Sequence, residues 1–248
     1  MAEITQSPSS PEDTFTSRKV LRHRLEQIGW VVVGLMLVVG VGSTINRMVF
    51  MAHAMAEPGS AYNAFDIRYV ELPWASWLHL LPALLIALTG PTQFMRQVRK
   101  RYRGWHRLAG RIYLIAGLIG AVTGFVIGGL NPFMGLDGPG FNEAMATLVF
   151  SSLVIWVLLS AYSAARRRNF ALHREWMVRS WALMMAIATE RILLGIFSAT
   201  TDVSMAVLFG TTFWMAGAIN MTAAEVWINL TRTPGKGQVH WKDLDARS

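Results

Sequence analysis

The chain has 248 residues, of which 53% are hydrophobic and 15% are charged, and its formal net charge is +8. A soluble domain carries roughly a quarter charged residues, so this composition does not fit a soluble protein. The absence of cysteine excludes disulfides, thiolate nucleophiles, iron–sulfur clusters and cysteine-based zinc sites. The positive charges lie in short loops between long apolar blocks, which indicates a membrane protein and argues against a nucleic-acid partner.

Polar segments flank a predicted membrane domain over residues 18–230. Residues 1–17 are rich in Ser and Pro and are predicted to be a disordered cytoplasmic tail, and residues 231–248 a second cytoplasmic tail. The small-residue sequence AHA at 52–54 resembles a signal-peptide cleavage site. Because a long polar region precedes the first apolar block and Arg47 follows it, we expect this span to remain as an uncleaved anchor.

Six apolar stretches, separated by charged loops, are each long enough to cross a bilayer, which takes about 20 residues of helix. The predicted fold class is therefore all-α, a six-transmembrane-helix bundle in contact with the lipid bilayer. The predicted spans cover residues 27–49, 72–95, 107–130, 144–165, 176–200 and 203–229.

The charges in the loops alternate in sign along the chain. Loops 96–111 and 166–179 are rich in arginine, whereas the other three loops carry mainly Asp and Glu. Lys and Arg concentrate in the cytoplasmic loops of membrane proteins. The pattern therefore predicts a multi-pass protein with both the N and the C terminus on the cytoplasmic side.

Two basic segments share one plan, in which an arginine cluster is followed by His-Arg, a further arginine and an outward-running helix. They are RYRGWHRLAGRIY (101–113) and RRRNFALHREWMVRSWA (166–182), and they place His106 and His173 at similar depths. Haem b takes two axial imidazoles, and arginines bind its propionates. The candidate iron ligands are therefore His106 and His173, with the candidate propionate-binding residues Arg107, Arg111, Arg174 and Arg179. Alternatively, both histidines bond helix termini or lipid headgroups at the membrane border.

His79 lies inside the second predicted span, in its outer half. Because a helix rises about 1.5 Å per residue, His79 is expected more than about 20 Å from the level of His106, too far to share one haem. An ionisable residue within the membrane is a functional candidate by default. His79 either serves a second haem or a proton relay, or makes a structural hydrogen bond between helices.

Glu190 and Arg191 lie near the middle of the fifth predicted span. A bare charge at that depth is costly, so each residue needs a partner or a wet cavity. They either line a proton or substrate path or form a structural ionic network. Gln93 and Glu225, near the inner ends of the second and sixth spans, are weaker candidates of the same kind.

Three blocks of the sequence resemble a bacterial family of predicted membrane proteins of unknown function. The blocks are HLLPALLIALTGPTQF (79–94), WHRLAGRIYLIAG (105–117) and LHREWMVRSWALMMAIATERI (172–192). The resemblance implies a protein of the bacterial cytoplasmic (inner) membrane. The positions that match the family pattern are His79, Gln93, His106, Arg111, His173, Arg179 and Arg191.

The layout is also remotely similar to the six-helix di-haem cytochrome b membrane proteins, which include ferric reductases. That similarity implies an inner ligand pair formed by His106 and His173. The outer pair departs from the pattern, because the fourth span contains no histidine, and His53 or Met145 would have to complete it with His79.

Three functions are compatible with these residues. The first is a b-type haem electron-transfer or reductase component that works with a quinone or a redox partner protein. The second is a cofactor-free transporter or channel-like protein with an intramembrane path through His79, Glu190 and Arg191. The third is a membrane scaffold or assembly factor, whose polar groups only fix helix packing. The sequence leaves open whether the protein is an enzyme.

Overall fold

The computed structural model describes residues 11–57 and 65–232, and helices are the only regular elements in these two ranges. The chain divides into two compact units, residues 1–35 and 36–248, and the elements described below belong to the second apart from the beginning of α1 (Pro11–Ala56). Helix α1 includes residues 11–17, which we predicted to be disordered. Its start carries Pro at the first position and acidic residues in the first turn, a pattern that favours helix initiation. The rest of the predicted tails, 1–10 and 233–248, lies outside the described residues.

Six segments of the described chain are helical, long and apolar enough to span a membrane, which confirms the all-α, six-span prediction. The short helices α2 (Ile67–Glu71) and α4 (Arg96–Arg101) lie in the connections. The six segments are α1 from His23 onward, α3 (Pro73–Phe94), α5 (Arg103–Gly124) continued by the π-helix η1 (Phe125–Leu130), α6 (Gly140–Arg166), α7 (Phe170–Met184) with α8 (Ala186–Thr200), and α9 (Met205–Thr231).

The fifth span is broken into α7 and α8 at Met185. This residue has φ −84° and ψ −1°, and its carbonyl accepts a tight-turn hydrogen bond of 3.0 Å from the Ala188 N–H. No proline or glycine marks the break in the sequence, so the hydropathy pattern did not indicate it. The break lies one turn before Glu190 and gives α8 a direction of its own.

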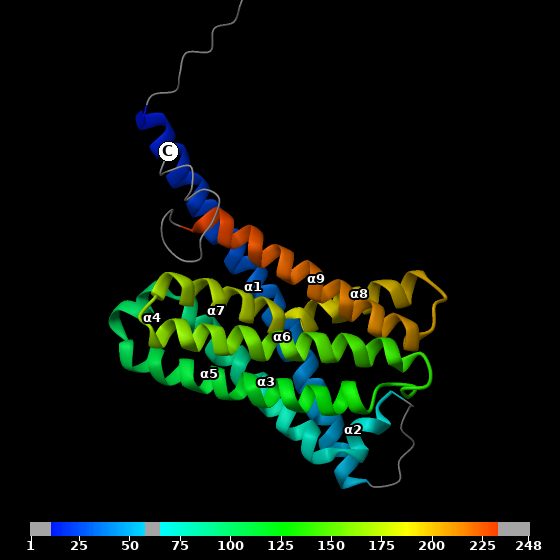
Figure 1. Ribbon diagram of the computed structural model, residues 1–248. Coiled ribbons are helices and arrows are strands. Elements are labelled where there is room, and N and C mark those ends of the chain that lie inside the picture. The colour runs from blue at the N-terminus through cyan, green and yellow to red at the C-terminus, as the bar shows by residue number, and fades with distance from the viewer. Residues whose placement is uncertain (1–10, 58–64, 233–248) are drawn as a thin grey trace, which may run out of the picture. The chain divides into compact units, whose positions relative to one another are not determined.

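Helices α3, α5, α6 and α7 lie side by side, with α5 packed on α3 and α6, and α6 packed on α7 and α9 (Figure 1). Helix α4 links α3 to α5 at one end, where the turn from α6 to α7 also lies (Figure 1). We call this the basic end, residues 95–107 and 164–174. The opposite end, residues 65–72, 131–143 and 201–205, is called the acidic end.

A tight turn sets the start of α7 against the last turns of α6. Arg168 adopts φ 58°, in the left-handed region that few side chains occupy. The Asn169 side chain then caps α7 by accepting a 3.1 Å hydrogen bond from the Leu172 N–H. This connection brings the first turn of α7, which carries His173, beside Ala161 of α6.

Candidate functional site

Helices α5 and α7 run in the same direction from the basic end, and two contacts fix their register. The hydroxyls of Tyr113 and Ser180 lie 3.2 Å apart, and these residues are 67 positions apart in the chain. One turn further along, Met184 packs against Gly117, again with a separation of 184 − 117 = 67. The two helices therefore face each other with a constant offset.

The same offset relates the two predicted ligands, since 173 − 106 = 67. His106 and His173 lie about two helical turns before the Tyr113–Ser180 contact, and seven residues return a helix to nearly the same face. The two imidazoles therefore stand at one depth on facing sides of α5 and α7. They are close enough for the charge of His173 to act on His106.

The two imidazoles differ in their hydrogen bonds. Nδ1 of His173 lies 2.8 Å from the carbonyl oxygen of Ala161. Because a carbonyl only accepts, Nδ1 carries the proton and Nε2 keeps its lone pair. In His106, Nδ1 is buried and has no hydrogen-bond partner among the described residues.

The residues around the His106–His173 pair come from three helices. Gln93 of α3 is buried, and its Oε1 would lie 3.3 Å from a Cβ at Gly110, one turn beyond His106 on α5. Trp181 of α7 stacks on Tyr113 with ring centroids 6.5 Å apart. The family-pattern residue Gln93 thus lies within one helical turn of His106 on the facing helix, and the Tyr113–Trp181 stack lies about two turns beyond the two histidines.

Arg99 of α4 is the cation that acts on His106 from outside the spans. Its guanidinium donates to the carbonyl of Gln93 at 3.2 Å and to that of Phe94, at the end of α3. Burial, and then the neighbouring Arg96, lower the pKa of Arg99 below its ordinary value. Helix α4 therefore brings the positive charge of Arg99 close to His106. From the sequence, the arginines of this loop had been interpreted only as the charges that set the topology.

The four predicted propionate-binding arginines have different surroundings. Arg107 and Arg111 are exposed on α5 at the basic end. Arg174 donates a 2.7 Å hydrogen bond to Thr231 Oγ1. Arg179 makes two hydrogen bonds to Glu225, of 2.6 and 3.0 Å, and stacks over Trp176 at 4.7 Å. Arg174 and Arg179 therefore tie α7 to α9, and Arg107 and Arg111 are the two whose charges face outward.

His79 lies in a separate place, on the side of α3 that packs against α5. Its Nδ1 is 3.0 Å from the carbonyl oxygen of Gly120, and its ring packs so closely on α5 that a Cβ at Gly124 would lie 3.0 Å from it. Gly120 is 120 − 106 = 14 positions beyond His106, about 21 Å along the helix. One planar cofactor does not reach both histidines.

A second cluster of ionisable side chains lies toward the acidic end. Arg68 of α2 forms an ion pair with Glu143, in the first turn of α6, and both side chains are buried. The second Glu143 oxygen accepts a 2.8 Å hydrogen bond from the Phe133 N–H. Burial by itself would lower the pKa of Arg68, but the charges of Tyr69 and Glu143, and hydrogen bonds to both, raise it above its ordinary value.

Glu190 and Arg191 belong to the same cluster. The Arg191 Nε lies 3.5 Å from Glu190 Oε2, so these neighbours do pair with each other. Glu190 is 0% exposed, and the charges of Arg68 and Glu143 also act on it. We name Arg68, Glu143, Glu190 and Arg191 the ionic cluster. From the sequence, Arg68 and Glu143 had been interpreted only as charges of the connecting loops. Nothing near them in the sequence indicates that they lie close to α8.

Comparison with protein families matches residues 76–228 to the model of a family described as predicted membrane protein (DUF2306). The chain belongs to this family. The match covers α3 to α9 and so includes both histidines at the basic end, His79, and all of the ionic cluster except Arg68. No curated protein and no solved structure matches the chain.

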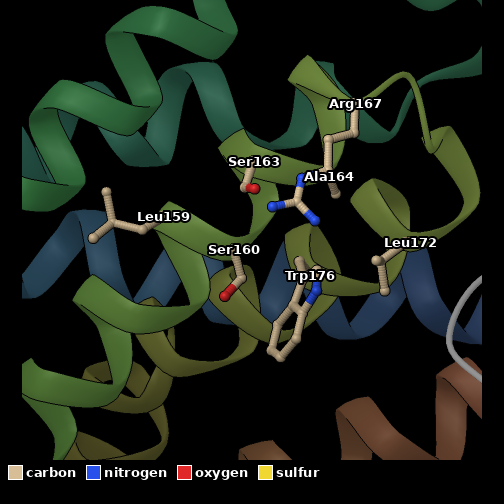
Figure 2. A pocket seen from close by; sticks show the side chains of 7 residues that line it. All are labelled: Leu159, Ser160, Ser163, Ala164, Arg167, Leu172 and Trp176. Atoms are coloured by element: carbon tan, nitrogen blue, oxygen red, sulfur yellow. The ribbon is translucent and has the colours of Figure 1, made fainter.

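This DUF2306 protein also has a groove on the surface of α6 and α7, with a volume of about 360 Å³. In Figure 2 the Arg167 guanidinium lies next to the Ser163 hydroxyl and above the Trp176 indole. The groove is lined by Leu159, Ser160, Ser163, Ala164, Arg167, Leu172 and Trp176. Neither histidine lines it, so the groove is separate from the His106–His173 pair.

Among the described residues, no group of three or more His, Asp and Glu side chains is arranged to hold a metal ion. A metal centre built from protein ligands alone is therefore not found in that part of the DUF2306 chain. A haem, whose porphyrin supplies four of the iron ligands, needs only two axial side chains from the protein.

Proposed function

We propose that this protein binds one haem b between His106 and His173 and serves as an electron-transfer or reductase component of the bacterial cytoplasmic membrane. The observation that carries the proposal is the register of α5 and α7. The contacts Tyr113–Ser180 and Gly117–Met184 share the 67-residue offset of the two histidines. Two imidazoles at one depth on parallel helices are the arrangement that bis-histidine ligation needs.

The hydrogen bonds of the two rings support this use. Metal-ligating histidines usually donate their second ring N–H to a carbonyl or carboxylate, which fixes the ring and its tautomer. His173 does so through Ala161, and His106 contributes a buried ring nitrogen that has no hydrogen-bond partner within residues 11–57 and 65–232. A bound haem b would supply one-electron transfer. Arg107 and Arg111 are the side chains best placed to bind its propionates, since they are exposed on the same helix as His106.

A single haem is favoured over two. Nδ1 of His79 is bonded to the Gly120 carbonyl, as in a metal-ligating histidine, but His53, one of the two residues considered as its partner, does not fit well. His53 is 61% exposed and lies 3.6 Å from Glu57 on α1. The fourth span, α6, contains no histidine. We therefore assign His79 to helix packing or proton relay.

The proposed orientation places the basic end in the cytoplasm, because arginine-rich loops stay on that side. Both termini then lie in the cytoplasm. The His106–His173 pair lies near that face, where a quinone or a redox partner protein would exchange electrons with it.

The test is a reduced-minus-oxidised absorption spectrum of the full chain, purified after expression with ample haem. We expect b-type bands in the wild type and their loss in His106→Ala and in His173→Ala. His53→Ala is the matched control, since its exposed side chain lies far along the chain from the pair, and it should keep the bands. Absence of bands in the wild type, or bands that survive replacement of both histidines, would contradict the proposal.

Cofactor-free transport is the second candidate function, and the buried ionic cluster is the observation that favours it. Charged side chains inside a membrane protein often mark substrate or ion pathways. If the wild type lacks haem but Glu190→Gln abolishes a measured flux while the protein still folds, transport replaces electron transfer as the conclusion.

A further inference from the structure

The ionic cluster is assembled from three elements and is not used by the proposed haem site. Arg68 comes from α2, Glu143 from α6, and Glu190 and Arg191 from α8, while Thr212 of α9 lies against the Glu190 carboxyl. Two guanidinium groups and two carboxyl groups thus share one interior region. Each carboxyl needs either a positive partner or a proton, because an uncompensated buried charge is costly.

The two carboxyl groups are not equivalent. Both oxygens of Glu143 are occupied, one by Arg68 and the other by the Phe133 N–H. Neither oxygen of Glu190 has a hydrogen-bond partner among the described residues, although both are buried. The nearby Thr212 hydroxyl donates instead to the carbonyl of Leu208, at 2.8 Å. Arg191 approaches Glu190 only to 3.5 Å, and its own side chain remains 26% exposed.

We propose that Glu190 is a proton-binding site of this protein, with the carboxyl group protonated when the Arg68–Glu143 pair is intact. A protonated carboxyl no longer repels the Glu143 carboxylate and no longer requires full charge compensation in the interior. It also gains a donor, for which the Thr212 hydroxyl oxygen on α9 is an acceptor within reach. This inference stands on the ionic cluster alone and does not depend on haem.

The ligand is a proton and not a metal cation. Hard cations take six or more oxygen ligands, and here only one carboxyl that lacks a hydrogen bond among the described residues and one hydroxyl face each other. Arg191 and Arg68 also act on Glu190, and a further cation would be repelled by both. A proton instead forms a covalent O–H bond with one carboxyl oxygen and needs no coordination shell.

The charged groups around Glu190 also suggest the direction of exchange. Arg191 reaches the surface of the protein, and Glu143 lies in the first turn of α6, bonded to the backbone of the 131–139 loop. Glu143 belongs to the acidic end, in the first turn of α6, so we expect the proton to exchange toward that end, away from the His106–His173 pair.

Infrared difference spectroscopy of the full chain in lipid nanodiscs tests the proposal, because a protonated carboxyl absorbs separately from a carboxylate. With pH raised stepwise, the wild type should lose one carboxylic-acid band, and the band should shift in D2O. Glu190→Gln should lack this band at every pH. The exposed Glu57→Gln is the matched control and should keep it.

A second variant keeps the proposal testable even if Glu190→Gln does not fold. Glu143→Gln removes the like charge beside Glu190 and frees Arg68, so the band should disappear at a lower pH than in the wild type. A wild-type band that Glu190→Gln leaves in place, or one that Glu143→Gln does not move, would overturn the proposal. So would a band that neither titrates nor exchanges in D2O. The haem spectrum of Glu190→Gln should match that of the wild type. A failure of the proton-binding proposal would therefore appear in the infrared bands alone, and a failure of the haem proposal in the absorption bands.

Discussion

The histidine pair and the ionic cluster differ in how their buried polar groups are partnered. At the basic end, two imidazoles lie in register. Nδ1 of His173 is bonded to the Ala161 carbonyl, and Nδ1 of His106 is buried with no hydrogen-bond partner among the described residues. At the acidic end, two carboxyls and two guanidiniums meet, and one carboxyl lacks a hydrogen bond. On the proposals above, a haem iron would complete the first arrangement, whereas a proton would complete the second. The same bundle would then hold a cofactor near one face and a titrating group toward the other.

The largest effect is expected from Arg68→Met in the ionic cluster. This change leaves Glu143 buried without its ion-pair partner, and removal of one member of a buried pair costs about 3–5 kcal/mol. We expect a strongly lowered free energy of unfolding, measured by thermal or denaturant unfolding in detergent. The double variant Arg68→Met, Glu143→Met should recover most of the loss, because no unpaired charge remains.

Arg179→Met provides the contrast at the basic end. Its partner Glu225 is 44% exposed and can be hydrated when the arginine is lost. Because the carboxylate left behind is half-exposed, whereas Glu143 is buried, the loss should be clearly smaller than for Arg68→Met. Equal losses of unfolding free energy in Arg179→Met and Arg68→Met would show that the exposure of the remaining carboxylate does not set the cost.

An intermediate effect is expected from Gly117→Leu, which acts on the register of α5 and α7. A side chain at Gly117 meets Leu158 of α6 and the end of Met184 of α7. Overpacking of this kind costs about 1–3 kcal/mol. It should also lower haem content without touching either histidine, because the helices must move apart.

Gly104→Ala is the matched control for this change. It lies on the same helix, and a Cβ there has nothing within 4 Å. Haem content and unfolding should both match the wild type. Full haem content in Gly117→Leu would show that the register of α5 and α7 does not hold the two histidines in place.

The six spans were predictable because apolar length and loop charge are local properties of the sequence. The repeated basic segments also place His106 and His173 at equivalent positions, and their use as a ligand pair stays a prediction. The ionic cluster was not predictable, because Arg68 and Glu143 are 75 positions apart and neither has a distinctive neighbourhood in the sequence. The break at Met185 was missed for a related reason. No proline or glycine near Met185 indicates the break in the sequence.

The smallest effect is expected from Tyr113→Phe, which removes one hydroxyl from the contact between α5 and α7. Ser180 keeps its own 3.0 Å hydrogen bond to the Met177 carbonyl, so no hydroxyl is left unsatisfied. The loss of unfolding free energy should be about 0.5–1.5 kcal/mol, the usual worth of a hydrogen bond. A double-mutant cycle with Ser180→Ala measures the pair itself. The haem bands should remain, because the Gly117–Met184 contact holds the same offset. Their loss would show that the hydroxyl pair alone sets the register.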